Sequence, residues 1–442
     1  MSNEATNVDG EGRGSLKLPD EFTGSAVPDS RTVSGVRIGF VLIGMGINFT
    51  GFALAADAAI SGGFVRGIAA CVVAGLVLGV GGAITGYVGA KLRLSAFMIL
   101  RRVFGTSGAG VVNLLLMLLA FGFFCVLSSM LGGTLAGFLA AVGMQMPQWA
   151  CSLGGAVLVA AATLYGFVAL QKITFFLLPL LTLGLVWLAT VSVQHAGAVA
   201  IMSYAGHGRS FGIVLSALLG GFIGFVVVFP NLTRYACTPR DGVVAGLIGM
   251  AVGFPVILIL AAISAVAAGK KDVVAVVGGL GFGAFALALA AISIWKTNVL
   301  NLYTTYLGVA AMRSSVSRVW LISAAGVAGG LLGAINVDTY FLPFLLFFAV
   351  AAPPIAVIYS IDCLTRGQLA TAEQGEESVP AYQWGALGSW IVAATVGGLA
   401  LAGILRLTGV PSLDSALTAG VVFGAAAFLR GQSAKLASSG QH

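Results

Sequence analysis

Runs of about 20 mostly apolar residues recur along almost the whole chain, separated by short segments rich in glycine, proline and charge. A helix of about 20 residues is long enough to cross the hydrocarbon core of a bilayer. The sequence therefore predicts an all-α integral membrane protein with twelve transmembrane helices. The predicted spans are 36–57, 64–90, 108–141, 149–170, 173–194, 210–233, 242–268, 276–311, 319–335, 341–361, 384–405 and 415–430.

The predicted span 276–311 contains a single lysine, Lys296, far from both of its ends. A lysine near the middle of a membrane costs about 2.5–3.5 kcal/mol on insertion scales, so such residues usually face a cavity or a substrate path. Ser293 and Thr297 begin a polar stripe at helical spacing, and Lys296 lies at the edge of that stripe. Lys296 is therefore the first functional candidate. The alternative is a lysine whose apolar stem lets the ammonium reach an interface.

Two predicted helices are interrupted by glycine near mid-span, the first at Gly44–Asn48 and the sixth at Gly220–Gly224. Interrupted helices at corresponding positions of two halves are typical of inverted-repeat transporters. In such proteins the backbone groups freed at the breaks bind substrate and ion near the midplane of the membrane. The alternative is that these glycines only let helices pack closely.

Composition and charge agree with a membrane protein. The chain is 59% hydrophobic and 8% charged, with a mean hydropathy of +1.03, values outside the range of soluble domains. Sixteen of the 22 lysines and arginines lie in segments on the side of the N-terminus, and five lie on the opposite side. The positive-inside rule then predicts cytoplasmic N- and C-termini. We expect the membrane to be a bacterial-type inner (plasma) membrane. The net charge of +7 is thus explained by topology, and no nucleic-acid partner is expected.

The same pattern predicts the domain organisation. Residues 1–34 are expected to form a disordered cytoplasmic tail, and 35–366 a transport core of ten helices. A cytoplasmic linker, 367–383, then leads to two accessory helices in 384–430, and 431–442 form a second tail.

The sequence contains no recognisable catalytic or metal-binding motif. The five cysteines show no metal-like spacing, and there is no GxSxG, HExxH or P-loop. We therefore expect neither an enzyme nor a cofactor nor a metal site.

Several short segments, in this order and spacing, resemble the nucleobase–cation symporter family, and in particular its cytosine/purine permeases. They are Val27–Arg31, Gly86–Lys91, Arg102–Gly105, Pro230–Tyr235, Trp295–Asn298 and Ala352–Pro354 with Asp362. The resemblance covers the chain from about Val27 to Arg366. It implies a LeuT-type fold with two inverted five-helix repeats, broken helices 1 and 6 and two accessory helices.

The resemblance also implies a function and a site. The function is secondary active import of a nucleobase such as cytosine or a purine, or of a related small planar heterocycle. Phe123 and Phe222 would flank the flat ring, as aromatic residues do in that family. Further substrate contacts are expected from Gly46, Asn48, Gly221, Ser293 and Asn298.

The ion site departs from the family pattern. There, two adjacent hydroxyl residues of helix 8 hold sodium together with carbonyls of helix 1. Here Lys296 replaces the first hydroxyl residue, while Thr297 keeps the second. We expect Lys296, Thr297, Gly44 and Ile47 to form the ion-coupling site, with the ammonium in the place of sodium. Transport would then be independent of sodium and either coupled to protons, with Lys296 as the candidate proton carrier, or uncoupled, and we favour proton coupling.

Two alternatives stay open. One is an amino-acid or amine permease of the same fold. The other is a transporter-derived sensor that binds its ligand without transporting it.

Overall fold

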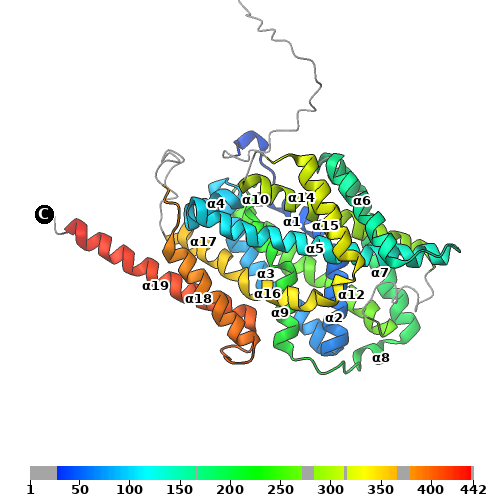
Figure 1. Cartoon of the computed structure of the whole chain (residues 1–442). Coiled ribbons are helices and arrows are strands. Elements are labelled where there is room, and N and C mark those ends of the chain that lie inside the picture. The colour runs from blue at the N-terminus through cyan, green and yellow to red at the C-terminus, as the bar shows by residue number, and fades with distance from the viewer. Residues whose placement is uncertain (1–26, 166, 271–282, 313–315, 366–378, 440–442) are drawn as a thin grey trace, which may run out of the picture.

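Helices make up nearly all of the described structure. The computed structural model describes residues 27–165, 167–270, 283–312, 316–365 and 379–439 (Figure 1). Within these ranges the pairing of extended backbone is limited to one isolated bridge, between Val33 and Ala236. The elements in chain order are η1 (Asp29–Arg31), α1 (Gly35–Gly46), α2 (Phe49–Gly62), α3 (Phe64–Leu92), α4 (Ala96–Phe104), α5 (Thr106–Ala141), α6 (Gln148–Tyr165), α7 (Phe167–Ala196), α8 (Ala198–Met202), α9 (Phe211–Val228), α10 (Pro230–Thr233), α11 (Pro239–Gly246), η2 (Leu247–Gly253), α12 (Phe254–Ala268), α14 (Ala284–Met312), α15 (Arg318–Ala334), η3 (Val337–Tyr340), α16 (Phe341–Ala351), α17 (Pro353–Thr365), α18 (Trp384–Leu401) and α19 (Pro411–Ser439).

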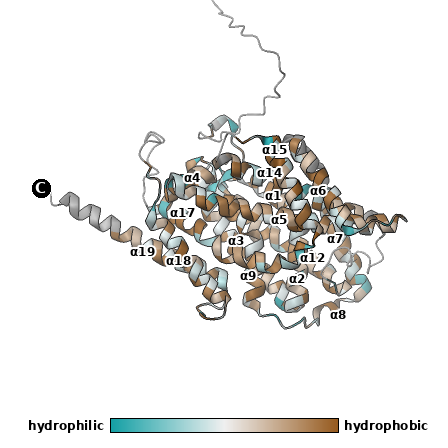
Figure 2. Cartoon of the chain, viewed as in Figure 1, coloured by the Kyte–Doolittle hydropathy of each residue, from teal (hydrophilic) through white to brown (hydrophobic). Residues whose placement is uncertain are grey.

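The helices have the length and the surface of membrane spans. Among the described residues, eight helical segments are long and apolar enough to cross a membrane, and the bent pair α1–α2 would make a ninth. Their outward faces are apolar, as the brown ribbons of Figure 2 show, and large side chains such as Leu183 and Val421 lie exposed there. Such a surface matches contact with lipid rather than water. The count of twelve spans stays a prediction, and residues 276–282 of the eighth lie outside the described ranges.

The predicted break in helix 1 is confirmed. α1 ends at Gly46 and α2 follows at a bend of 67°. Asn48 caps α2, because its side chain accepts a hydrogen bond from the Gly51 amide at 2.8 Å. The chain therefore turns while the Gly51 amide, in the first turn of α2, keeps a hydrogen-bond partner.

The predicted break at Gly220–Gly224 in helix 6 is wrong, because α9 runs without interruption from Phe211 to Val228. The glycines serve close packing instead. A side chain at Gly220 would collide with the Leu345 carbonyl of α16, and one at Gly221 would collide with Leu54 of α2. Helix 6 is interrupted later, at Phe229, before the short α10.

Helix 10 is broken between α16 and α17 at Ala352, where Pro353 and Pro354 follow. Pro354 has no amide hydrogen, so the Val350 carbonyl loses its helical donor. The accessory helices supply the missing donors: Ser415 Oγ of α19 donates to the Val350 carbonyl at 2.7 Å, and Trp390 Nε1 of α18 donates to the Ala351 carbonyl at 2.8 Å.

Two of the predicted domain boundaries need correction. Residues 27–34 belong to the folded part, since Val27 is buried and the Val33 amide donates to the Tyr235 carbonyl at 2.7 Å. At the other end, α19 continues to Ser439, where a tail was expected from residue 431. Residues 1–26 and 366–378 lie outside the described ranges, so the rest of the tail and most of the linker stay predictions.

Replacing Ser415 with alanine should lower the free energy of unfolding by about 1–3 kcal/mol, because the Val350 carbonyl is then buried without its donor. Thermal unfolding of the purified protein in detergent measures the loss. Ser389→Ala is the matched control, since the Ser389 hydroxyl bonds only the Gly385 carbonyl of its own helix. A loss no larger than that of the control would contradict the assignment.

Candidate functional site

Lys296 lies on α14 beside the break in helix 1. Its side chain is only 5% exposed, and its Nζ donates to the Ile47 carbonyl at 3.4 Å. That carbonyl is available because its helical donor, the Gly51 amide, bonds the Asn48 side chain instead. A charged group thus occupies the place where helix 1 exposes its backbone.

The other residues predicted for ion coupling lie around this contact. Thr297 is next to Lys296 on α14, and its hydroxyl donates to the Ser293 carbonyl at 3.0 Å. Gly44 is buried in α1, one helical turn before Ile47. Among the described residues the structure shows no ion pair for Lys296, and its hydrogen bond goes to the Ile47 carbonyl. No group of three or more histidine, cysteine or acidic side chains that could hold a metal occurs in the described ranges.

Asn48 stabilises the bend between α1 and α2. Besides capping α2, its Nδ2 donates to the Met45 carbonyl at 2.7 Å, so one side chain bonds backbone on both sides of the bend. Gly46 is buried at the end of α1, and a side chain there would collide with the ring of Phe254. Both residues were predicted to contact substrate, and the contacts seen here shape the backbone at the same point.

Phe222 lies on α9 against the start of α2. It is buried, and its ring centroid is 4.9 Å from that of Phe254 and 6.2 Å from that of Phe225. A methyl group added to Gly51 would lie 3.4 Å from Phe222 Cζ. Phe222 therefore belongs to the same neighbourhood as Asn48 and the Ile47–Lys296 contact.

Phe123 lies on α5 in a second aromatic cluster. Its ring meets Phe344 and Phe341 of α16 edge-on, with centroids 5.4 Å and 6.1 Å away. The structure shows no ring contact between Phe123 and Phe222 among its described aromatic pairs. The two phenylalanines are thus anchored separately, on α5 and on α9.

The remaining predicted polar residues lie on α14. Ser293 is buried one turn before Lys296. Asn298 is fully buried, and its Nδ2 donates to Ser128 Oγ of α5 at 3.0 Å. Its Oδ1 has no hydrogen-bond partner in the described part of the chain. Ser128 also packs against Gly333 of α15, so Asn298 points into the interface of α5, α14 and α15 rather than toward α2.

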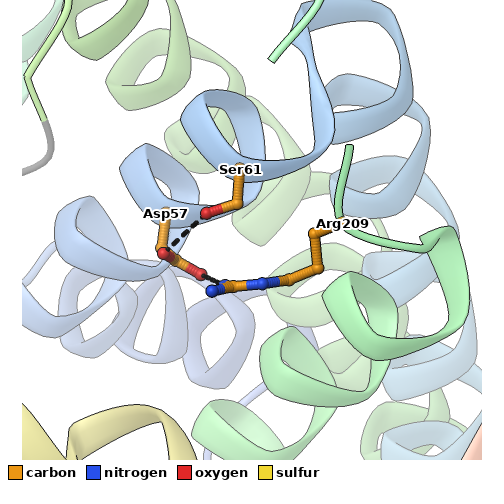
Figure 3. A network of polar contacts seen from close by, with 3 residues as sticks. All are labelled: Asp57, Ser61 and Arg209. Atoms are coloured by element: carbon orange, nitrogen blue, oxygen red, sulfur yellow. Dashed lines mark hydrogen bonds and ion pairs between the residues drawn. The ribbon is translucent and has the colours of Figure 1, made fainter. Parts of the chain in front are cut away.

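Sequence reasoning missed an ion pair that joins helix 1 to the segment before helix 6. Asp57 of α2 bonds Arg209 Nη1 through Oδ2 at 2.6 Å, and the Ser61 hydroxyl donates to Asp57 Oδ1 at 3.0 Å (Figure 3). The Ser61 carbonyl also accepts the amides of His207 and Arg209 at 3.1 Å. The only signal in the sequence was that two opposite charges fell on the same predicted side.

Comparison with known proteins gives a consistent result. A family described as "Permease for cytosine/purines, uracil, thiamine, allantoin" matches residues 26–428. The cytosine permease of Escherichia coli (strain K12) is 24% identical over 372 residues, which cover 79% of this chain and 82% of that protein.

Solved structures share the fold. The inward-facing conformation of Mhp1 superposes with a TM-score of 0.78 at 16% identity, covering 96% of both chains. Mhp1 in a closed conformation with bromovinylhydantoin bound, described as a nucleobase-cation-symport-1 family transporter, gives 0.75 at 16% identity, over 92% of this chain and 94% of that one. A Na+-coupled sialic acid symporter gives 0.65 at 11% identity, over 94% and 92%. These likenesses confirm the predicted LeuT-type fold.

Replacing Asn48 with alanine should lower the free energy of unfolding by about 0.5–2 kcal/mol, the usual effect of losing a helix N-cap. Asn48→Asp keeps the acceptor for the Gly51 amide and should lose less. Melting temperatures of the two variants in detergent test this. Equal losses would show that the cap contributes nothing.

Proposed function

This chain belongs to the family of permeases for cytosine/purines, uracil, thiamine and allantoin, and on that premise we propose that it imports a nucleobase such as cytosine or a purine, or a related small planar heterocycle. As a member of that family with many apolar helices, it is a multi-pass membrane transporter and not an enzyme. The relatives whose names state a substrate agree: the curated matches are cytosine permeases, and Mhp1 was solved with a hydantoin bound.

The substrate would lie beside the break in helix 1. Phe222 supports this position, because its ring borders the start of α2 and an aromatic ring stacks favourably on a flat ligand. Phe123 would contact the opposite face of the ring. Gly46, Asn48 and Gly221 would contribute through the backbone, and Ser293 is the polar candidate on α14. Asn298 bonds Ser128 of α5 instead and points away from this position.

The observation that carries the coupling proposal is the contact between Lys296 Nζ and the Ile47 carbonyl. A sodium ion beside this ammonium would be repelled by about 4 kcal/mol at 4 Å and an effective dielectric constant near 20. Lys296 therefore stands in for a transported cation. Transport is sodium-independent, and a proton is the coupled ion.

Uptake by proteoliposomes tests the substrate class. Labelled cytosine, uracil, adenine and hypoxanthine should include at least one compound that accumulates, whereas amino acids and amines should not. Phe222→Ala and Phe123→Ala should each weaken its binding by at least about 1 kcal/mol, through lost aromatic contact. Phe348→Ala, a buried phenylalanine of α16, is the control. Binding without accumulation would favour a sensor, and unchanged affinity in both variants would remove the two rings from the site.

Sodium independence is tested by uptake across sodium concentrations at fixed pH. The wild type should respond to a pH gradient and not to sodium. Lys296→Thr restores a hydroxyl pair with Thr297 and should introduce a sodium requirement. Lys91→Thr removes an equivalent but exposed charge and should change nothing. Strong sodium stimulation of the wild type would refute the proposal.

The proposed orientation has both termini in the cytoplasm, as the distribution of basic residues predicts. In a Cys237→Ser background, a cysteine at Val199, an exposed position on α8, should react with an impermeant maleimide added outside intact cells. A cysteine at Arg102, exposed on α4, should react only after the cells are opened. The reverse pattern would invert the topology.

A further inference from the structure

Pro230 leaves a buried carbonyl without its helical donor at the end of α9. The Val226 carbonyl would normally accept the amide of residue 230, and proline has none. What remains within the backbone is a long contact from the Phe229 amide, at 3.4 Å. Val226 and Pro230 are both buried in the protein, so bulk water does not replace the missing donor.

Tyr359 of α17 supplies that donor from another helix. Its side chain is 1% exposed, and its Oη lies 3.3 Å from the Val226 carbonyl oxygen and 3.1 Å from that of Val227. The single hydroxyl proton is therefore shared between two carbonyls of the last turn of α9, and the same hydroxyl also contacts the Thr85 hydroxyl of α3. Unlike a bond within one helix, this bond must break whenever α9 and α17 separate.

The contact between helices 6 and 10 differs between the two ends of α9. Helices 6 and 10 also touch at the far end of α9, where Gly220 lies against the Leu345 carbonyl. That contact is steric packing without a hydrogen bond. The Tyr359 bond is the directional contact that the structure shows between α9 and α17.

We propose that Tyr359 is a positioning residue that holds the Pro230 end of α9 against α17. The transporter opens on the side of Pro230 when the hydrogen bond from the Tyr359 hydroxyl to the Val226 carbonyl breaks. The inference rests on the proposed transport function, because only a transporter needs the two helices to part. Its basis is the pairing of a proline-freed carbonyl with a buried hydroxyl on a neighbouring helix.

Cys363 offers a native reporter of this joint. It lies one helical turn after Tyr359 on α17 and is buried. In the Cys237→Ser protein, alkylation of Cys363 by N-ethylmaleimide is followed by peptide mass spectrometry. Tyr359→Phe keeps the ring, removes the hydroxyl and should accelerate the reaction at least about fivefold, the factor expected from losing one buried hydrogen bond. Tyr87→Phe, on the half-buried Tyr87 of α3, is the matched control and should have no effect.

Repeating the measurement in a variant that lacks Pro230 makes the test specific. Pro230→Ala gives the Val226 carbonyl its own amide donor, so adding Tyr359→Phe there should accelerate alkylation by no more than about twofold. Equal acceleration in both backgrounds, or none in either, would overturn the proposal. Cys71, fully buried in α3, reports global unfolding, and its equal acceleration would also overturn it. The assay uses no substrate, so absence of heterocycle uptake would be a separate failure, that of the proposed function.

Discussion

The structure depends on one constraint, that a backbone carbonyl released inside a membrane must find a donor in the protein. Each helix break described here meets it with a side chain from elsewhere in the chain. Lys296 serves the Ile47 carbonyl, Tyr359 serves the Val226 carbonyl, and Ser415 serves the Val350 carbonyl. The breaks are therefore tertiary joints, and each ties a bent helix to a specific neighbour.

The three contacts differ in the charge of the donor side chain. At Val226 and Val350 the donors are neutral hydroxyls, so separation exposes one polar pair. At Ile47 the donor carries a positive charge and has no carboxylate partner in the described ranges. A buried, unbalanced charge is far more sensitive to its surroundings than a hydroxyl is. This difference is why we propose the helix 1 break, and not the other two, as the ion-coupling site.

Helices 1 and 6 are also held together at both ends. On the α4 side the Val33 amide bonds the Tyr235 carbonyl, and on the α8 side Asp57 bonds Arg209. Between these ends, the glycines of α9 let Leu54 of α2 approach closely. The two helices nearest the proposed substrate position thus behave as one packed unit, with Phe222 at their contact.

The sequence by itself determined the helical class, the family, the break in helix 1 and the singular position of Lys296, because each follows from local hydrophobicity, short motifs or an isolated charge. It could not tell a break from close packing at Gly220–Gly224, since glycine permits both and only the neighbouring Leu345 carbonyl decides between them. Nor could the sequence identify Tyr359 as the donor to the Val226 carbonyl. The partners of the freed carbonyls lie far away in sequence, 133 residues for Tyr359 and Val226 and 249 for Lys296 and Ile47, and only the folded chain brings them within bonding distance.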